Sequence, residues 1–333
     1  MKGRGLVSVV TPVYNGADYL AECVESVLAQ TYENWDYTIV DNASEDATPE
    51  IAQRYASRDS RIRHLRFEEF VDATVNHNRA FDAISPDSEF CKVVQADDCL
   101  YPECISLMVA AAEISDTVGI VGSYQLRGSR VGLGGLPYGT TFAPGRDVLR
   151  GTLLGLVNVT GNPTATMLRS AFIRERQPFY QEGLRHEDTE AGLWMLSRHD
   201  FAFVHQVLTF ARQQPEARTS WSDNMNSIAA EDIVFLLRYG RSVLDGVEYR
   251  RRLRACLERY LWWHVRQFPR TSRLRDPEFF EFQQSRRSLI LADGKDDPDV
   301  RAAMGFIKAL LLRGAIHTHA SSRAGLTAPR LGE

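Results

Sequence analysis

Two adjacent carboxylates, Asp97 and Asp98, are the residues of this sequence that most clearly suggest chemistry. They come shortly after the apolar, β-branched run Phe90 to Val94, which predicts a buried strand. Open α/β sheets bind ligands at the carboxyl ends of their strands, and carboxylate oxygens suit Mg²⁺ and Mn²⁺. The pair therefore predicts a site for Mn²⁺ or Mg²⁺. The alternative is a polar turn in which Asp98 caps the next helix.

Two other predicted strands, at residues 6–10 and 35–40, also end in polar or turn-forming residues. Carboxyl ends of parallel strands meet at one edge of a sheet, so we expect these residues to share a pocket with the acidic pair. They are Thr11, Pro12, Tyr14, Asp41 and Asn42.

The elements that must position these residues follow from the apolar spacing, which alternates between strand and helix periods. Strand, helix, strand, polar loop and helix in succession indicate a βαβ unit. The prediction is an α/β fold with a doubly wound sheet. Neither GxGxxG nor GxxxxGK[ST] follows the first strand, which disfavours a dinucleotide dehydrogenase or a P-loop kinase. Further strands are predicted at 63–67, 90–94 and 118–124, and helices at 18–28, 74–84 and 104–113.

Composition limits the other possibilities. The 333 residues carry a net charge of −4 with 44% hydrophobic content, which is typical of a globular protein and not of a nucleic-acid binder. Five scattered cysteines without CxxC spacing predict free thiols in a reducing compartment. The sequence shows no signal peptide and no run of about 20 apolar residues. We therefore predict a cytoplasmic protein.

Four motifs occur in order within the first hundred residues: VSVVTPVYNG at 7–16, SVLAQTY at 26–32, VDNASEDAT at 40–48 and ADD at 96–98. Together they resemble family-2 glycosyltransferases of the GT-A fold. The resemblance implies a Rossmann-like, mostly parallel sheet flanked by helices. It also implies an inverting enzyme that uses a nucleotide-diphosphate sugar with Mn²⁺ or Mg²⁺.

The resemblance assigns roles to particular residues. Pro12, Tyr14, Asp41 and Asn42, beside Thr11, match the family's nucleoside-binding positions. Asp97 and Asp98 match its metal-binding pair, with Asp98 as the direct ligand. The chain departs from the family at Asn42, where many members have Asp, and at His77-Asn78, where many read Arg-Asn. Whether Arg79 replaces that arginine is open, and Arg212 matches an arginine that contacts the diphosphate.

An inverting transfer needs a carboxylate that takes the acceptor proton. The segment His186-Glu187-Asp188-Thr189 precedes an apolar helix and matches the family's Glu-Asp motif. Asp188 is thus the expected catalytic base, and the alternative is a simple N-cap. Gly161 to Thr166 resembles the family's acceptor-side segment. Trp221 would either stack on a sugar or pack in the interior.

The resemblance fades after about residue 220. We predict a catalytic domain at 1–225, a helical extension at 226–317 and a disordered tail at 318–333. Residues 249–275 hold nine arginines and one glutamate among aromatic side chains. This segment is either an interfacial helix on an anionic membrane leaflet or a helix packed on the catalytic domain.

The predicted function is transfer of a sugar to a sugar or lipid-linked acceptor, with no nucleic-acid partner, in surface or extracellular polysaccharide or glycolipid assembly. The predicted location is cytoplasmic, with peripheral contact to the inner face of the membrane if the interfacial interpretation holds. Two alternatives remain. One is a sugar nucleotidyltransferase, which would normally carry a glycine- and arginine-rich loop with a lysine after its first strand, and residues 11–18 lack both. The other is a catalytically silent scaffold of a polysaccharide assembly complex.

Overall fold

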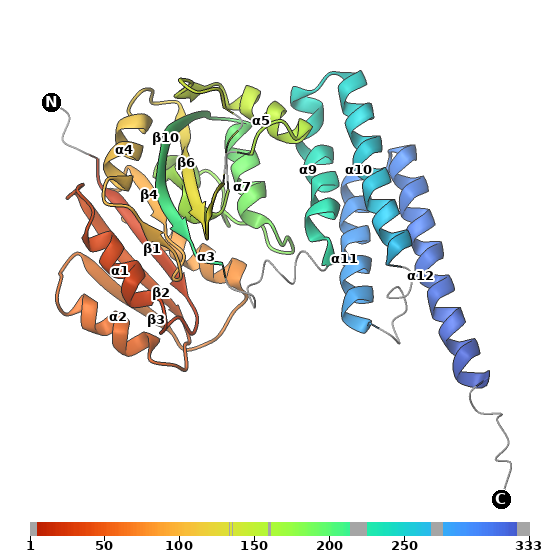
Figure 1. Cartoon of the computed structure of the whole chain (residues 1–333), viewed down its shortest axis with the longest axis horizontal. Helices are drawn as coiled ribbons and strands as arrows, with labels where there is room; N and C mark the ends of the chain where they lie inside the picture. Colours follow the sequence, from red (N-terminus) through yellow and green to blue (C-terminus); the bar gives the residue numbers. More distant parts are fainter. Residues whose placement is uncertain are drawn as a thin grey trace, which may run out of the picture. The chain divides into compact units, whose positions relative to one another are not determined.

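The computed structural model describes residues 5–132, 134, 136–158, 161–213, 225–267 and 276–324. The chain divides into two compact units, Met1–Gln214 and Pro215–Glu333. The first unit is an α/β domain and the second is helical (Figure 1). Each is described by itself below.

The first unit begins with four parallel strands in the order β3-β2-β1-β4. The apolar, β-branched runs of β1 and β2 suit strands that are buried on both faces, whereas β3, at the edge of the sheet, is more polar and only partly buried. Side chains from one face of these strands form a core with three helices, α1, α2 and α4, while α3 contacts β1 and β2. The bounds are β1 Val7–Val13, α1 Leu20–Leu28, β2 Trp35–Asn42, α2 Thr48–Ala56, β3 Ile62–Phe67, α3 Ala73–Asp82, β4 Phe90–Val93 and α4 Cys104–Ala112.

The rest of the sheet is mixed. β9 lies between β4 and β6 and is antiparallel to both, whereas β10 is parallel to β6. The α/β class is therefore as predicted. The sheet has fewer parallel pairs than expected, because β9, which comes late in the chain, pairs antiparallel with both of its neighbours. The bounds are β5 Cys99–Leu100, β6 Val118–Arg127, β7 Arg130–Gly132, β8 Phe142–Ala143, α5 Gly145–Leu154, η1 Pro163–Ala165, β9 Thr166–Arg169, α6 Ser170–Ile173, α7 Glu187–Leu196 and β10 Asp200–Ala211.

The alternative in which Asp98 caps a following helix is wrong. The short strand β5 comes directly after Asp98, and α4 starts only at Cys104, with Glu103 at its N-cap. Asp98 is instead 2% exposed. Its carboxylate is held inside the domain.

The second unit consists of α9 Ser227–Val243, α10 Gly246–Arg266, α11 Pro277–Gly294 and α12 Pro298–Ala324. The tail was expected to start at residue 318, but α12 continues to Ala324. Residues 325–333 lie outside the described part of the chain, as does Trp221.

The apolar side of α10 is buried within the helical unit. Leu253, Leu257, Tyr260 and His264 are all buried, and α10 contacts α9 and α12. Tyr260 also donates a hydrogen bond of 2.7 Å to Gln283 of α11. The side of the helix that an interfacial interpretation needs for membrane insertion is thus occupied by neighbouring helices. Residues 268–275 of the arginine-rich segment lie outside the described residues.

No helix within the described residues is both long and apolar enough to cross a bilayer.

Candidate active site

The buried carboxylate of Asp98 is the centre of a polar cluster at the carboxyl end of β4. Asn162 Nδ2 donates to Asp98 Oδ2 at 3.1 Å, and the backbone N–H of Arg212 donates to Asp98 Oδ1 at 3.2 Å. These partners are 64 and 114 residues away along the chain. Three segments, the β4 end, η1 and the β10 end, therefore converge on one acid.

Among the described residues no hydrogen bond or ion pair joins a cationic side chain to the Asp98 carboxylate. Lys92, which interacts with it electrostatically, donates instead to the carbonyls of Thr164 and Thr166. The Arg212 guanidinium donates to Glu22 at 2.6 Å and to the carbonyl oxygen of Asp97 at 3.3 Å. Burial raises the pKa of Asp98 to about 6, and the neighbouring charge of Asp97 acts in the same direction. Burial also raises the pKa of Asp97. Hydrogen bonds from Thr164, Arg212 and Asn162 oppose the shift of Asp98 without cancelling it.

This environment fits a divalent cation. The carboxyl oxygens are hard donors, and a bound cation would offset the cost of burial that raises the pKa of both acids. Within the described residues no group of three or more His, Cys, Asp or Glu side chains is suited to a metal. Mg²⁺-type ions, however, are commonly held by one or two carboxylates together with substrate phosphates. Asp98 and Asp97 match that donor set.

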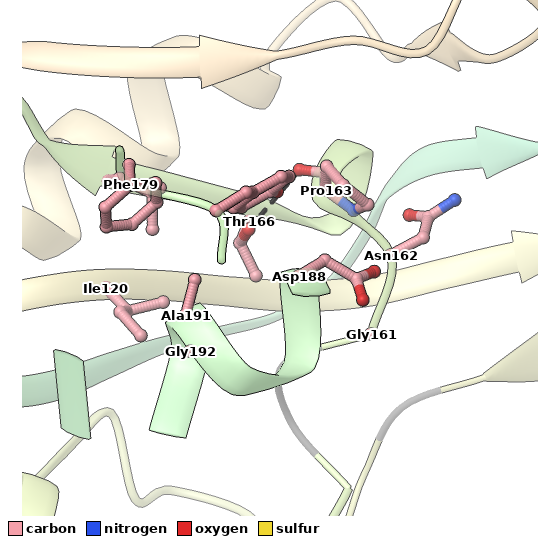
Figure 2. Close-up of a pocket in the computed structure, with 11 residues that line it drawn as sticks. Ile120, Gly161, Asn162, Pro163, Thr166, Phe179, Asp188, Ala191 and Gly192 are labelled. Atoms are coloured by element: carbon pink, nitrogen blue, oxygen red, sulfur yellow. Dashed lines mark hydrogen bonds between the residues drawn. The ribbon is translucent and has the colours of Figure 1, made fainter. Parts of the chain in front are cut away.

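Asp188 lies on the same side of the site as Asn162. It is the second residue of α7 and is partly buried, and it lines a small cavity with Gly161, Asn162 and Tyr180. Figure 2 shows the Asp188 carboxylate and the Asn162 amide at one end of this cavity. His186 is the N-cap residue and makes no side-chain cap. Asp188 therefore stands two residues after the N-cap, where its Oδ1 accepts from the Thr189 N–H at 2.7 Å.

A second cavity lies at the carboxyl ends of β1, β2 and β3. The Tyr14 and Phe70 side chains, 45% and 56% exposed, lie with ring centroids 4.6 Å apart. Both line the cavity together with Ser44, Asp46 and Arg66. Exposed rings beside polar groups can hold a flat, polar ligand. Arg66 and Phe70 were missed, although extending the strand-end argument to the third strand would have found them.

Asp41 is fully buried at the end of β2. Its Oδ1 accepts from the Ser44 N–H at 2.9 Å, and His64 Nε2 is 3.5 Å from its Oδ2. Burial by itself raises the pKa of Asp41, but His64 and the hydrogen bonds from Ser44 outweigh it and hold the pKa below its ordinary value of 3.8. Asp41 thus remains ionised and shapes the loop that carries Ser44.

Several predicted site residues have their side chains engaged inside the protein. Thr11 Oγ1 hydrogen-bonds the Tyr37 hydroxyl at 2.8 Å in the core. The Asn42 amide both donates to and accepts from the backbone of Val71, at 2.8 and 3.1 Å. Arg79 stacks 3.9 Å over the Phe67 ring and donates to Asn42. Pro12 is buried within β1.

Asn162 was singled out only as part of the Gly161–Thr166 segment. Its own signal is local: it precedes Pro163, and its side chain caps η1 by accepting from the Ala165 N–H at 3.2 Å. That signal predicts a turn and nothing more. The contact with Asp98 depends on the tertiary fold.

Comparison with known proteins gives a consistent result. The model of the family described as "Glycosyl transferase family 2" matches residues 8–176, which is 169 of 333 residues. The chain is 27% identical over 222 residues to the putative glycosyltransferase EpsE of Bacillus subtilis, covering 62% of this chain and 77% of that protein. It is 44% identical over 79 residues to the putative teichuronic acid biosynthesis glycosyltransferase TuaG of Bacillus subtilis. It is also 33% identical over 119 residues to the glycosyltransferase GlyG of Streptococcus pneumoniae serotype 4. These last two matches span only 31% and 39% of the relatives' own lengths.

Solved structures share the fold. TarS 1–349 of S. aureus, in complex with UDP-GlcNAc, has a TM-score of 0.64 at 17% identity over 96% of this chain and 92% of that chain. The mannosyltransferase PcManGT from Pyrobaculum calidifontis, in complex with GDP-Man and Mn²⁺, has a TM-score of 0.55 at 15% identity, with coverages of 95% and 87%. The expected GT-A-type fold with a helical C-terminal region is thereby confirmed.

Proposed function

Because the chain belongs to glycosyl transferase family 2 and is a transferase, we propose that it moves a sugar, with inversion, from a nucleotide-diphosphate sugar to an acceptor hydroxyl. One observation carries this proposal. Asn162 donates to Asp98 and lines the same cavity as Asp188. A metal-binding acid and a candidate base would then act on one substrate.

Asp98, with Asp97, would hold Mn²⁺ or Mg²⁺, which neutralises the charge of the leaving diphosphate when bound. The chain itself contributes the position of these acids. Asn162 and the Arg212 N–H each hold one oxygen of Asp98, which fixes the direction of its carboxylate.

Asp188 would accept the proton of the acceptor hydroxyl as the new glycosidic bond forms. Its place in the first turn of α7 keeps it ionised, because the positive end of the helix dipole favours an anion there. A single base is enough, since the diphosphate leaves without protonation by an acid partner. Direct attack from the side opposite the leaving group inverts the anomeric carbon.

The nucleoside would bind in the cavity between Tyr14 and the ends of β2 and β3. Two structural neighbours were solved with UDP-GlcNAc and with GDP-Man, which supports a nucleotide-sugar donor of either base type. The Asn42 amide, which matches a nucleoside-binding position of the family, hydrogen-bonds the backbone of Val71 instead. We propose that Tyr14, Ser44 and Arg66 contact the nucleoside. Asp41 would act indirectly, by holding the loop that carries Ser44.

The relatives point to polysaccharide assembly, since TuaG is described as a teichuronic acid biosynthesis enzyme. We propose a sugar or lipid-linked acceptor of a surface or extracellular polysaccharide or glycolipid. Peripheral contact with an anionic leaflet would use the exposed arginine-rich side of α10, because its apolar side is packed.

The decisive test measures binding and turnover together. UDP-GlcNAc, UDP-glucose, UDP-galactose and GDP-mannose are screened for thermal stabilisation with and without Mn²⁺, and for hydrolysis to the nucleoside diphosphate. We expect Mn²⁺-dependent stabilisation by at least one donor. Asp98→Ala should abolish both signals, whereas Asp87→Ala, at an exposed position on the same unit, should abolish neither.

The alternatives give different results. A silent scaffold would bind a donor and release no nucleoside diphosphate. A sugar nucleotidyltransferase would release pyrophosphate from a nucleoside triphosphate and a sugar phosphate. Mn²⁺-dependent nucleotide affinity that is unchanged in Asp98→Ala would reject the metal assignment.

A further inference from the structure

One face of α3 contacts two parts of the proposed catalytic site, the segment that carries Asp188 and the loop that carries Asp97 and Asp98. Thr74, His77, Asn78 and Phe81 recur at the spacing i, i+3, i+4 and i+7, which places them on one side of a helix. The helix is well fixed at its start, where Asp72 accepts from the Thr74 N–H at 2.9 Å. This face carries polar contacts in two directions.

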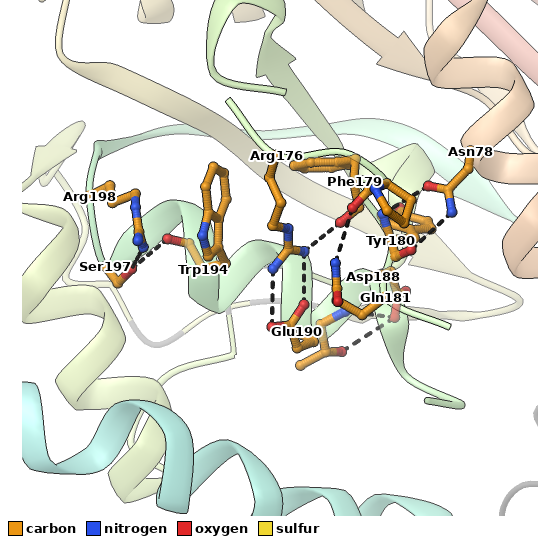
Figure 3. Close-up of polar contacts among 12 residues, drawn as sticks. Asn78, Arg176, Phe179, Tyr180, Gln181, Asp188, Glu190, Trp194, Ser197 and Arg198 are labelled. Carbon is orange, nitrogen blue, oxygen red and sulfur yellow. Dashed lines mark hydrogen bonds and ion pairs between the residues drawn. The ribbon is translucent and has the colours of Figure 1, made fainter. Parts of the chain in front are cut away.

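The first direction leads to Asp188. Thr74 Oγ1 donates to Glu187 Oε1 at 3.2 Å, inside the protein and directly beside Asp188 in sequence. Asn78 makes a paired contact with the backbone of Tyr180: its Nδ2 donates to the carbonyl at 2.9 Å, and its Oδ1 accepts from the N–H at 2.8 Å. Figure 3 shows this pair beside the segment that leads into α7.

The second direction leads to the acidic pair. His77 Nδ1 lies 2.7 Å from the Ala73 carbonyl, which can only accept, so Nδ1 carries the proton. In the neutral ring Nε2 is then the acceptor, and it receives the Gln95 amide at 3.0 Å. Gln95 stands two residues before Asp97, and its backbone N–H donates to Thr164 Oγ1 at 3.0 Å. α3 therefore also contacts the loop that presents Asp97 and Asp98.

Arg176 gives the segment from 176 to 190 a second set of contacts, separate from those of α3. Arg176 donates to both oxygens of the buried Glu190 in α7, at 3.1 and 2.8 Å, and also to the Phe179 carbonyl (Figure 3). Bidentate pairs of this kind fix geometry strongly. Arg176 and Asn78 thus hold Phe179, Tyr180 and Glu190, which lie on either side of Asp188 in the chain.

We propose that Thr74 and Asn78 are positioning residues that hold Asp188 at the correct distance from the metal-binding acids. The inference rests on the proposed function, because it assumes that Asp188 is the base. Neither residue needs to touch substrate. Their effect arises because a displacement of about 1 Å between reacting groups can cost on the order of 100-fold in rate.

The test uses variants that remove one contact and keep the volume. Thr74→Val removes the hydroxyl that reaches Glu187, and Thr74→Ser keeps it. Asn78→Asp keeps the acceptor for the Tyr180 N–H and loses the donor. Asp82→Ala, on an exposed position of the same helix, is the control. The measured reaction is Mn²⁺-dependent hydrolysis of whichever screened nucleotide sugar the wild type cleaves fastest.

We expect kcat to fall about 10- to 100-fold in Thr74→Val and Asn78→Asp. The KM for the donor and the Mn²⁺-dependent affinity for UDP should stay within about twofold, which also shows that a variant is folded. Thr74→Ser and Asp82→Ala should behave like wild type. Each position has its own variant, so the inference can still be tested if one of the two variants does not fold.

A double-mutant cycle then identifies the route of the effect. If Thr74 acts through Asp188, Thr74→Val lowers kcat in the wild type but causes no further loss in Asp188→Asn. Full additivity, a rise in KM alone, or a wild-type kcat in both Thr74→Val and Asn78→Asp would overturn the inference. A wild-type rate in Asp188→Asn, or no hydrolysis by the wild type, would instead refute the proposed function, and the inference with it.

Discussion

The amide of Asn162 donates to the buried carboxylate of Asp98 across 3.1 Å. The same side chain accepts from Gln125 at 2.8 Å, so its orientation is fixed from a second strand. Partners of metal ligands that fix their direction typically contribute 10- to 100-fold to metal affinity. With Asp98 as the proposed metal ligand, we expect this contact to affect nucleotide binding.

Asn162→Ala should weaken the Mn²⁺-dependent affinity for UDP by about 10- to 100-fold, because the Asp98 carboxylate loses a donor that orients it. Isothermal titration with UDP, with and without Mn²⁺, measures the effect. Asn158→Ala, at an exposed position nearby in sequence, is the control. An unchanged affinity would mean that the amide only stabilises η1.

Asp188→Asn should lower turnover by about 10²- to 10⁴-fold while donor affinity survives, because the amide keeps the size of the side chain and cannot accept a proton. Steady-state hydrolysis and UDP titration on one preparation separate the two quantities. Near-normal turnover with normal binding would remove Asp188 from the mechanism.

The lowered pKa of Asp41 predicts that part of the free energy of unfolding depends on pH. Its folded-state pKa lies below the ordinary value of 3.8, so the folded state favours the ionised form. The resulting stabilisation is fully present above the unfolded-state pKa and disappears as the pH falls through the folded-state pKa. In urea unfolding between pH 3 and about 7, the difference between wild type and Asp41→Asn should shrink toward the acidic end. A difference that does not change with pH would contradict this origin.

Ala43 is a residue whose replacement should stabilise the protein. It has a φ of 60° in the loop after β2, a left-handed conformation that costs a residue with a Cβ about 1–2 kcal/mol. Because glycine also increases the entropy of the unfolded chain, we expect Ala43→Gly to raise the free energy of unfolding by about 0.5–1 kcal/mol. The control Ala29→Gly changes an exposed alanine with a φ of −80° and should not stabilise. Equal effects at both positions would show that the left-handed backbone carries no strain.

The exposed side of α10 predicts a salt-sensitive interaction with anionic surfaces. Its apolar side is packed, while Arg250, Arg251 and Trp262 are exposed, the last at 67%. We expect the protein to sediment with anionic vesicles at low salt and to be released at high salt, because screening weakens exposed charges. Sedimentation with zwitterionic vesicles would indicate apolar insertion instead. No sedimentation with either kind would reject the membrane contact.

The local part of the site was readable from the sequence. The acids at 97 and 98 follow an apolar run, and Asp188 starts an apolar helix, so strand ends and helix starts were predictable from short-range patterns. The four motifs identified the family because their residue types, order and spacing are all visible in the first hundred residues of the sequence. The parallel order of β1, β2 and β4 follows from the same short βαβ repeats.

The tertiary structure alone decided how those residues are used. β9 enters the sheet antiparallel between β4 and β6 and brings Asn162 to Asp98, although 64 residues separate the two in the chain. Asn42 was expected at the nucleoside and Arg79 was considered as a replacement for a family arginine, yet their polar atoms contact Val71 and Glu69. A side chain's partner depends on which distant backbone groups the packed core leaves unpaired, because buried N–H and C=O groups must find hydrogen bonds. That requirement acts only on the assembled fold, and no local pattern in the sequence records it.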